Sequence, residues 1–97
     1  MRSMRDSRRQ ARRIRVDTAG WPIPALVDHA LATYVEWRES ADAIADSYRR
    51  WSVAPAGERA PRFAAYIAAL DQEQAAAGVY AESISELERR LPDPAPG

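Results

Sequence analysis

The stretch PALVDHALATYVEWRESADAIADSYRRW, residues 24–51, decides the fold of this 97-residue chain. Within it, apolar and aromatic residues recur at alternating intervals of three and four residues, and eight charged residues lie between them. This is the spacing of an α-helix that packs one side against another helix. Prolines at 22 and 24 suit its first turn, so we predict a helix over residues 24–53. The stripe consists of Val27, Ala30, Tyr34, Trp37, Ala41, Ile44, Tyr48 and Trp51, with Leu26 and Leu31 widening its start.

A second stripe of the same kind follows a break at residues 52–61. Two prolines and a glycine favour a turn there, and Pro61 suits the first turn of the next helix. We predict that helix over residues 61–91, with a start near Ala56 as the alternative. The terminal PDPAPG, residues 92–97, is predicted to lack regular structure. The second stripe consists of Phe63, Tyr66, Ile67, Leu70, Ala77, Tyr80, Ala81, Ile84, Leu87 and Leu91.

Two helices of similar length joined by a short link predict an all-α fold, a long antiparallel helical hairpin. Each stripe is wider than a two-helix contact requires, and the chain has no Cys to reinforce a small core with disulfides. We therefore expect two hairpins to dimerise into a four-helix bundle, with a monomer that has an aromatic core as the alternative. The residues that we expect in the core or the interface are Val27, Leu31, Tyr34, Trp37, Ile44, Tyr48, Trp51, Phe63, Ile67, Leu70, Tyr80, Ile84 and Leu87.

The charge is balanced over the whole chain but divided along it. The chain has 14 basic and 14 acidic side chains. Residues 1–16 hold seven Arg against one Asp, a net charge of +6, whereas residues 17–97 hold seven Arg against 13 acids, or −6. We expect a flexible or partner-ordered basic arm over 1–16, a connector over 17–23, and an acidic helical body. All the cations are Arg and Ala is abundant, a composition typical of a bacterial genome rich in G and C.

The basic arm has several possible roles. Its arginines, with no aromatic residue among them, fit non-specific contacts with nucleic-acid phosphates rather than base stacking. Three alternatives stay open: a solvated run, a contact with an acidic protein surface, or a start codon assigned upstream of a true start near Val16. The candidate phosphate contacts are Arg8, Arg9, Arg12, Arg13 and Arg15.

Candidate catalytic residues are few. His29 is the only histidine, so with no Cys it builds no zinc site, and we expect a surface or capping role for it. Glu73 and Gln74 interrupt the second stripe at the height of Trp37 and Arg38 in the hairpin. We expect either a solvated lapse in the stripe or a polar layer in which Glu73 accepts a hydrogen bond from Trp37 or Arg38; the functional alternative is a carboxylate acting as an acid or base. We predict no enzymatic activity, no metal and no cofactor.

The length, the hairpin and the lack of Cys resemble the WXG100 secreted proteins of Gram-positive bacteria. That family has a Trp-x-Gly between its helices and a Tyr-x-x-x-Asp/Glu export signal after the second helix. Here Trp51-Ser52-Val53 reaches the turn without a Gly, and Tyr80 is followed four residues later by Ile84. The resemblance implies a secreted helical hairpin.

The function that the sequence favours is a non-enzymatic protein–protein interaction module acting through an aromatic-rich seam. The alternative is a nucleic-acid-associated protein that uses the arm, and the WXG100-like hairpin is the third possibility. No apolar run is long enough to span a membrane, and a twin-arginine signal lacks its apolar segment. We therefore expect a cytoplasmic homodimer.

Overall fold

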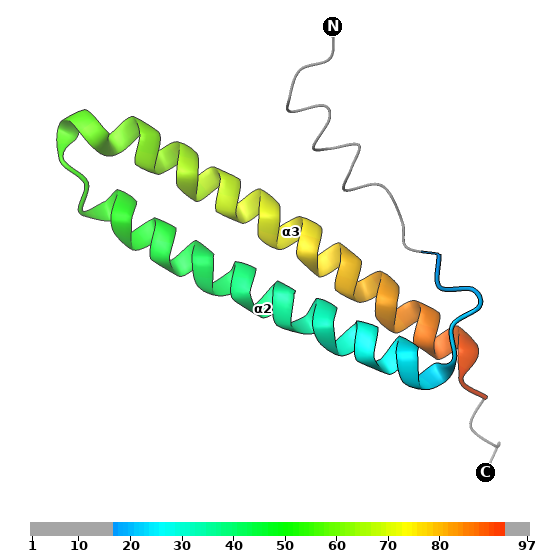
Figure 1. Cartoon of the computed structure of the whole chain (residues 1–97). Helices are drawn as coiled ribbons and strands as arrows, with labels where there is room; N and C mark the ends of the chain where they lie inside the picture. Colours follow the sequence, from blue (N-terminus) through cyan, green and yellow to red (C-terminus); the bar gives the residue numbers. More distant parts are fainter. Residues whose placement is uncertain (1–16, 93–97) are drawn as a thin grey trace, which may run out of the picture.

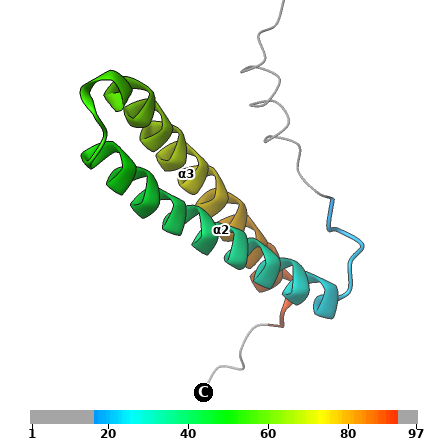
Figure 2. The same cartoon turned by 60° about the vertical axis from the view of Figure 1, so that its left-hand side comes forward.

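The computed structural model describes residues 17–92, which form an all-helical hairpin. Helix α2 spans Ile23–Ser52, a short 3-10 helix η1 spans Ala56–Glu58, and helix α3 spans Arg59–Arg90. The two long helices run side by side in opposite directions and are joined by a turn at one end (Figure 1). The prediction of a long antiparallel hairpin is confirmed, and the second view shows the same pairing (Figure 2).

Helix α2 begins directly after a proline and has two arginines in its last turn. Pro22 precedes the helix in an extended conformation (φ −68°, ψ 158°), and Pro24 occupies its first turn. The fixed φ of proline suits these positions, and its missing N–H would have no partner in the first turn. Arg49 and Arg50 lie in the last turn, where positive charge complements the helix dipole. The helix begins and ends one residue earlier than the sequence analysis placed it.

Helix α3 begins directly after the 3-10 turn. Pro55 is extended, and its carbonyl accepts a hydrogen bond from the Glu58 N–H at 2.8 Å, which closes η1. The chain continues from Glu58 into the α-helix at Arg59, between the two predicted starts, and Pro61 falls in the first turn. The helix ends at Arg90, one residue before the predicted end.

The two helices meet along one continuous strip that we call the inner seam. Its residues follow one another at alternating spacings of three and four, and each is buried or half-buried. This spacing is that of helices packed as in a coiled coil. The inner seam consists of Leu26, Ala30, Thr33, Trp37, Ser40, Ile44, Ser47 and Trp51 of α2 and Arg62, Tyr66, Ala69, Glu73, Ala76, Tyr80, Ser83 and Leu87 of α3.

This seam differs from the predicted stripe of α2 at every second position. Thr33, Ser40 and Ser47 face α3 in place of Tyr34, Ala41 and Tyr48, and Leu26, which was predicted only to widen the stripe, does so in place of Val27. Three of these four seam residues carry small hydroxyl side chains, which allow close approach of the helices. The two tyrosines are wider and are 42% and 50% exposed, so they lie beside the seam.

Thr33 and Ser83 form a buried polar contact across the seam. They are 5% and 6% exposed, and their hydroxyl oxygens lie 2.9 Å apart. Each oxygen also lies within hydrogen-bond distance of a carbonyl in the preceding turn, Ala30 for Thr33 and Tyr80 for Ser83. The two hydroxyl protons therefore serve both the cross-helix bond and a bond back to one helix, which satisfies this pair without water.

The apolar core of the hairpin is thin. In residues 17–92 the buried apolar side chains are Leu26, Ala30 and Ala69, and only Leu26 is large. A hairpin of this size gains little stability from so small a core, and no disulfide reinforces it. The packing between α2 and α3 therefore leaves much of the apolar surface of the two helices exposed to solvent.

Candidate interaction surface

The residues expected in the core or interface divide into two groups in the structure. Those in the inner seam are Trp37, Ile44, Trp51, Tyr80 and Leu87. Those beside it are the exposed Val27, Leu31, Tyr34, Tyr48, Phe63 and Ile67, with the half-buried Leu70 and Ile84. The second group lies on one flank of each helix.

This flank forms a single surface, which we call the apolar face. Each of its residues comes one position after a residue of the inner seam. Two antiparallel helices are related by a two-fold axis perpendicular to the plane that contains both helix axes. Rotation about this axis exchanges α2 and α3 without moving a residue from one side of the plane to the other. The residues that follow the seam by one position therefore lie on the same side of the hairpin in both helices. The apolar face consists of Val27, Leu31, Tyr34, Arg38, Ala41, Ala45 and Tyr48 of α2 and Phe63, Ile67, Leu70, Gln74, Ala77, Ala81 and Ile84 of α3.

Ring contacts connect the apolar face of one helix to the seam of the other. Tyr34 lies 5.5 Å from Tyr80 between ring centroids, and Tyr48 lies 5.7 Å from Tyr66. Phe63 of α3 lies 5.0 Å from Trp51 of α2. These contacts hold the exposed rings in place at favourable aromatic distances. The apolar face is therefore continuous from α2 to α3.

The aromatic residues form two clusters, one on each side of mid-length. In the cluster nearer the turn, Trp51 stacks on Tyr66 with centroids 5.7 Å apart and planes 12° apart. In the other cluster, Trp37 stacks on Tyr80 at 5.4 Å and 14°. These stacked pairs fix the register of the hairpin, because each joins one residue of α2 to one of α3.

The apolar face is interrupted at its middle by Arg38 and Gln74. Both are exposed, and neither makes a side-chain hydrogen bond or ion pair within residues 17–92. Beside them in the inner seam, the indole Nε1 of Trp37 donates a hydrogen bond to Oε1 of Glu73 at 3.0 Å. The predicted polar layer is confirmed, with Trp37 as the donor to Glu73.

The other flank of the hairpin, which we call the opposite face, differs in character. It holds five acids and one arginine among alanines, and its one large aliphatic residue is Val79. Asp46 on this face pairs with Arg50 at 3.1 Å, an exposed contact of little energetic weight. The opposite face consists of His29, Ala32, Glu36, Glu39, Ala43, Asp46 and Arg50 of α2 and Ala65, Ala68, Gln72, Ala75, Val79, Glu82 and Glu86 of α3.

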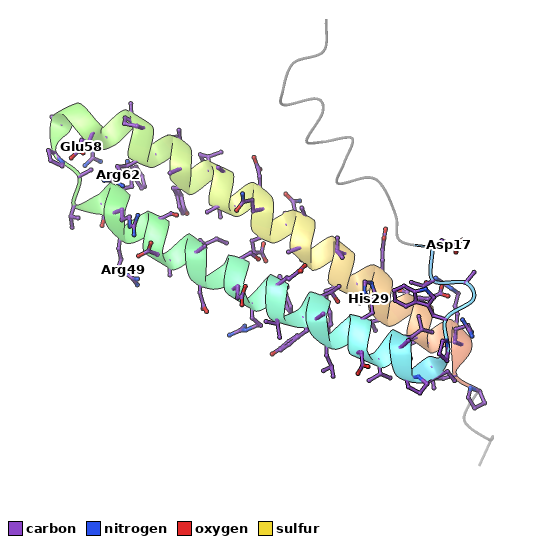
Figure 3. All side chains as sticks on the ribbon, in the orientation of Figure 1. Asp17, His29, Arg49, Glu58 and Arg62 are labelled. Carbon is purple, nitrogen blue, oxygen red and sulfur yellow. The ribbon has the colours of Figure 1, made fainter. Side chains whose placement is uncertain are left out.

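His29 lies at the open end of the hairpin, beside the segment that leads into α2 (Figure 3). Its ring meets the edge of Trp21 with centroids 5.5 Å apart. In the same region Arg90 donates a hydrogen bond to the carbonyl of Ala19 at 3.2 Å. His29 thus helps to hold the connector against the hairpin, a packing role in place of the predicted surface or capping role.

Within residues 17–92, no three His, Asp or Glu side chains gather in a way that could hold a metal ion. The described helices also include none with the length and apolar character needed to cross a membrane. The five candidate phosphate-binding arginines, Arg8, Arg9, Arg12, Arg13 and Arg15, lie outside the described residues.

Comparison with known proteins found no match to a family model, a curated protein or a solved structure.

The apolar face includes members that the sequence analysis did not single out as interface residues. Arg38 of α2 and Gln74 of α3 belong to it. The signal for them is present in the sequence as a second strip of alternating three- and four-residue spacing, offset by one residue from the seam. Which of two adjacent strips faces the other helix depends on the partner helix, so one helix alone does not distinguish them.

Proposed function

We propose that this chain is a non-enzymatic interaction module whose apolar face binds another helical surface, with a second copy of the chain as the partner. The observation that carries the proposal is the contrast between a thin core and an exposed apolar face. Leu31 is 59% exposed, Tyr34 42% and Ile67 40%, whereas within residues 17–92 Leu26 is the one large side chain that is fully buried. Contiguous apolar surface of this kind marks a site of association.

The dimensions of the face fit such an interface. Helices of this length extend for about 45 Å at 1.5 Å per residue, and two packed helices present a width of about 20 Å. The face therefore offers about 900 Å² per copy, close to the ~800 Å² per partner of a standard protein interface. Tyrosine, phenylalanine and isoleucine on this face are suited to a helix-on-helix contact.

A matched pair of substitutions on α3 tests the proposal. Ile67 on the apolar face and Val79 on the opposite face are 40% and 42% exposed, so either Glu substitution places a charge at a similarly exposed site. We expect Ile67→Glu to abolish association and Val79→Glu to preserve it, while circular dichroism shows both chains helical. Sedimentation velocity measures self-association, and capture from the native host measures other partners.

The proposal fails if both variants associate as the unaltered chain does, or if both lose association to the same degree. The first result would mean that the apolar face is not used. The second would mean that a charge anywhere on the helix disrupts the fold, which the helical signal of the two variants checks directly.

The second candidate function is contact with nucleic-acid phosphates through residues 1–16. The net charge of +6 in this segment supports it, because neutralising several phosphates gives an affinity that falls steeply with salt. We expect a chain lacking residues 1–16 to lose binding to duplex DNA or RNA at low salt. Equal affinities of the full and shortened chains at two salt concentrations would contradict this candidate.

A further inference from the structure

We propose that two copies pack through their apolar faces with their turns at the same end, so that α2 of each copy lies against α3 of the other. This inference rests on the proposed function and adds the orientation of the partner. It assigns to Arg38 the role of selecting that orientation.

Two symmetric arrangements place one apolar face on another. If the two-fold axis runs parallel to the helices, both turns lie at one end and α2 faces the partner's α3. If the axis runs across the helices, the turns lie at opposite ends and α2 faces the partner's α2. Isologous contact of one face with itself allows both. Large residues meet alanines in either arrangement, so shape does not separate them.

The polar middle of the face does separate them. The contacts of Trp37 with Glu73 and of Tyr34 with Tyr80 set the hairpin register, which places Arg38 and Gln74 at nearly the same height. With the turns at one end, Arg38 meets the partner's Gln74 and lies near the partner's Glu73. An amide oxygen and a carboxylate are both acceptors for a guanidinium.

With the turns at opposite ends, Arg38 meets its own counterpart. Helix α2 spans Ile23–Ser52, so Arg38 lies beside its midpoint, and an antiparallel α2 pair brings the two Arg38 side chains together. Two like charges in a partly desolvated contact repel, whereas the first arrangement pairs each with acceptors. Arg38 therefore favours the turns at one end.

The charges elsewhere on the hairpin favour the apolar face over the opposite face for self-association. Glu36 and Glu39 on α2 would lie against acids of the opposite face of a second copy. Arg50 is the one basic residue of this face and pairs with Asp46 of its own copy, and Arg89 pairs with Glu86. Contact of two copies through the opposite face would thus set like charges against one another.

A distance between the two turns tests the orientation. The chain has no Cys, so Gly57→Cys provides a single labelling site, and a side chain at Gly57 meets no atom within 4 Å. We expect pulsed electron–electron double resonance to give a distance of about 20–30 Å between the nitroxides of the two copies in the dimer. This is the separation of two adjacent helix layers plus the length of the labels. A single distance of about 45 Å or more, the length of the helices, would overturn the proposed orientation.

The same label on an Arg38→Leu background tests the role of Arg38. Without the charge, the unfavourable contact of the second arrangement disappears, so we expect a long-distance population beside the short one. A short distance alone in Arg38→Leu would overturn the role assigned to Arg38.

The outcomes separate the orientation from the proposed function. A long distance between the two labels in an intact dimer overturns the orientation but not the proposed function. A labelled chain that sediments as a monomer overturns the second copy as partner. The proposed function is tested separately, by the comparison of Ile67→Glu with Val79→Glu, and equal association of these two variants would contradict it.

Discussion

The two flanks of the hairpin lie on the same pair of helices and beside the same inner seam, yet they differ in almost every residue. The apolar face carries aliphatic and aromatic side chains interrupted by Arg38 and Gln74, whereas the opposite face carries alanine, acids and a single large aliphatic, Val79. Because both flanks are equally accessible to water in a lone hairpin, packing between α2 and α3 does not explain the asymmetry. We infer that the apolar face is shaped by what covers it.

The largest effect that we expect is on the seam that both faces share. Trp51 stacks on Tyr66 and contacts Phe63, so Trp51→Ala removes contacts that join the helices beside the turn. We expect a loss of about 3 kcal/mol in the free energy of unfolding, measured by urea denaturation at fixed chain concentration. Trp51→Phe keeps an aromatic ring there and is expected to lose about 1 kcal/mol. Unchanged stability in Trp51→Ala would mean that these rings do not hold the hairpin.

A matched pair on α2 sharpens the comparison of the faces. Leu31 on the apolar face is 59% exposed, and Val35 on the outer surface of the helix is 52% exposed. We expect Leu31→Glu to weaken self-association by about 2 kcal/mol, roughly thirtyfold, because it buries a charge in the interface. Val35→Glu is expected to change the dissociation constant less than about threefold. Similar dissociation constants for the two variants, measured by sedimentation equilibrium, would break the distinction between the surfaces.

The buried hydroxyl pair tests the inner seam in a different way. Thr33→Val keeps the shape of the side chain and removes the bond to Ser83, which leaves that hydroxyl only the Tyr80 carbonyl. We expect a loss of about 1 kcal/mol in the free energy of unfolding. Adding Ser83→Ala is expected to recover part of this loss, since no buried hydroxyl then remains at the contact. A Thr33→Val chain as stable as the parent would show that the cross-helix bond contributes nothing.

The smallest effect belongs to the ion pairs of the opposite face. Asp46 contacts Arg50 at 3.1 Å and Arg49 at 3.5 Å, and all three side chains are substantially exposed. We expect Asp46→Asn to cost less than about 0.5 kcal/mol in unfolding free energy because water and salt screen these charges. The oligomeric mass is expected to stay the same. A changed mass would indicate that the opposite face takes part in association.

The sequence predicted the elements of the fold better than the surfaces between them. Prolines at 22, 24 and 61 mark the helix starts, and the periodic apolar residues identify the two helices. The bond between Trp37 and Glu73 was also foreseeable, because pairing the helices about their turn brings these residues to one height.

The offset of the inner seam was not predictable from the apolar pattern. A search for large apolar residues selects Tyr34 and Tyr48, whereas close helix packing favours the smaller Thr33 and Ser47. These hydroxyl residues look like surface positions until the opposing helix is known. The contact of Thr33 with Ser83 across the seam distinguishes the core residues from the residues of the apolar face.

Sedimentation equilibrium of the unaltered chain, from low to high micromolar concentration, tests the use of the apolar face most directly. We expect a mass of twice 10.8 kDa that shifts toward the monomer mass in Leu31→Glu and stays at the dimer mass in Val35→Glu. A mass of 10.8 kDa at every concentration, with no difference between the two variants, would contradict dimerisation through this face.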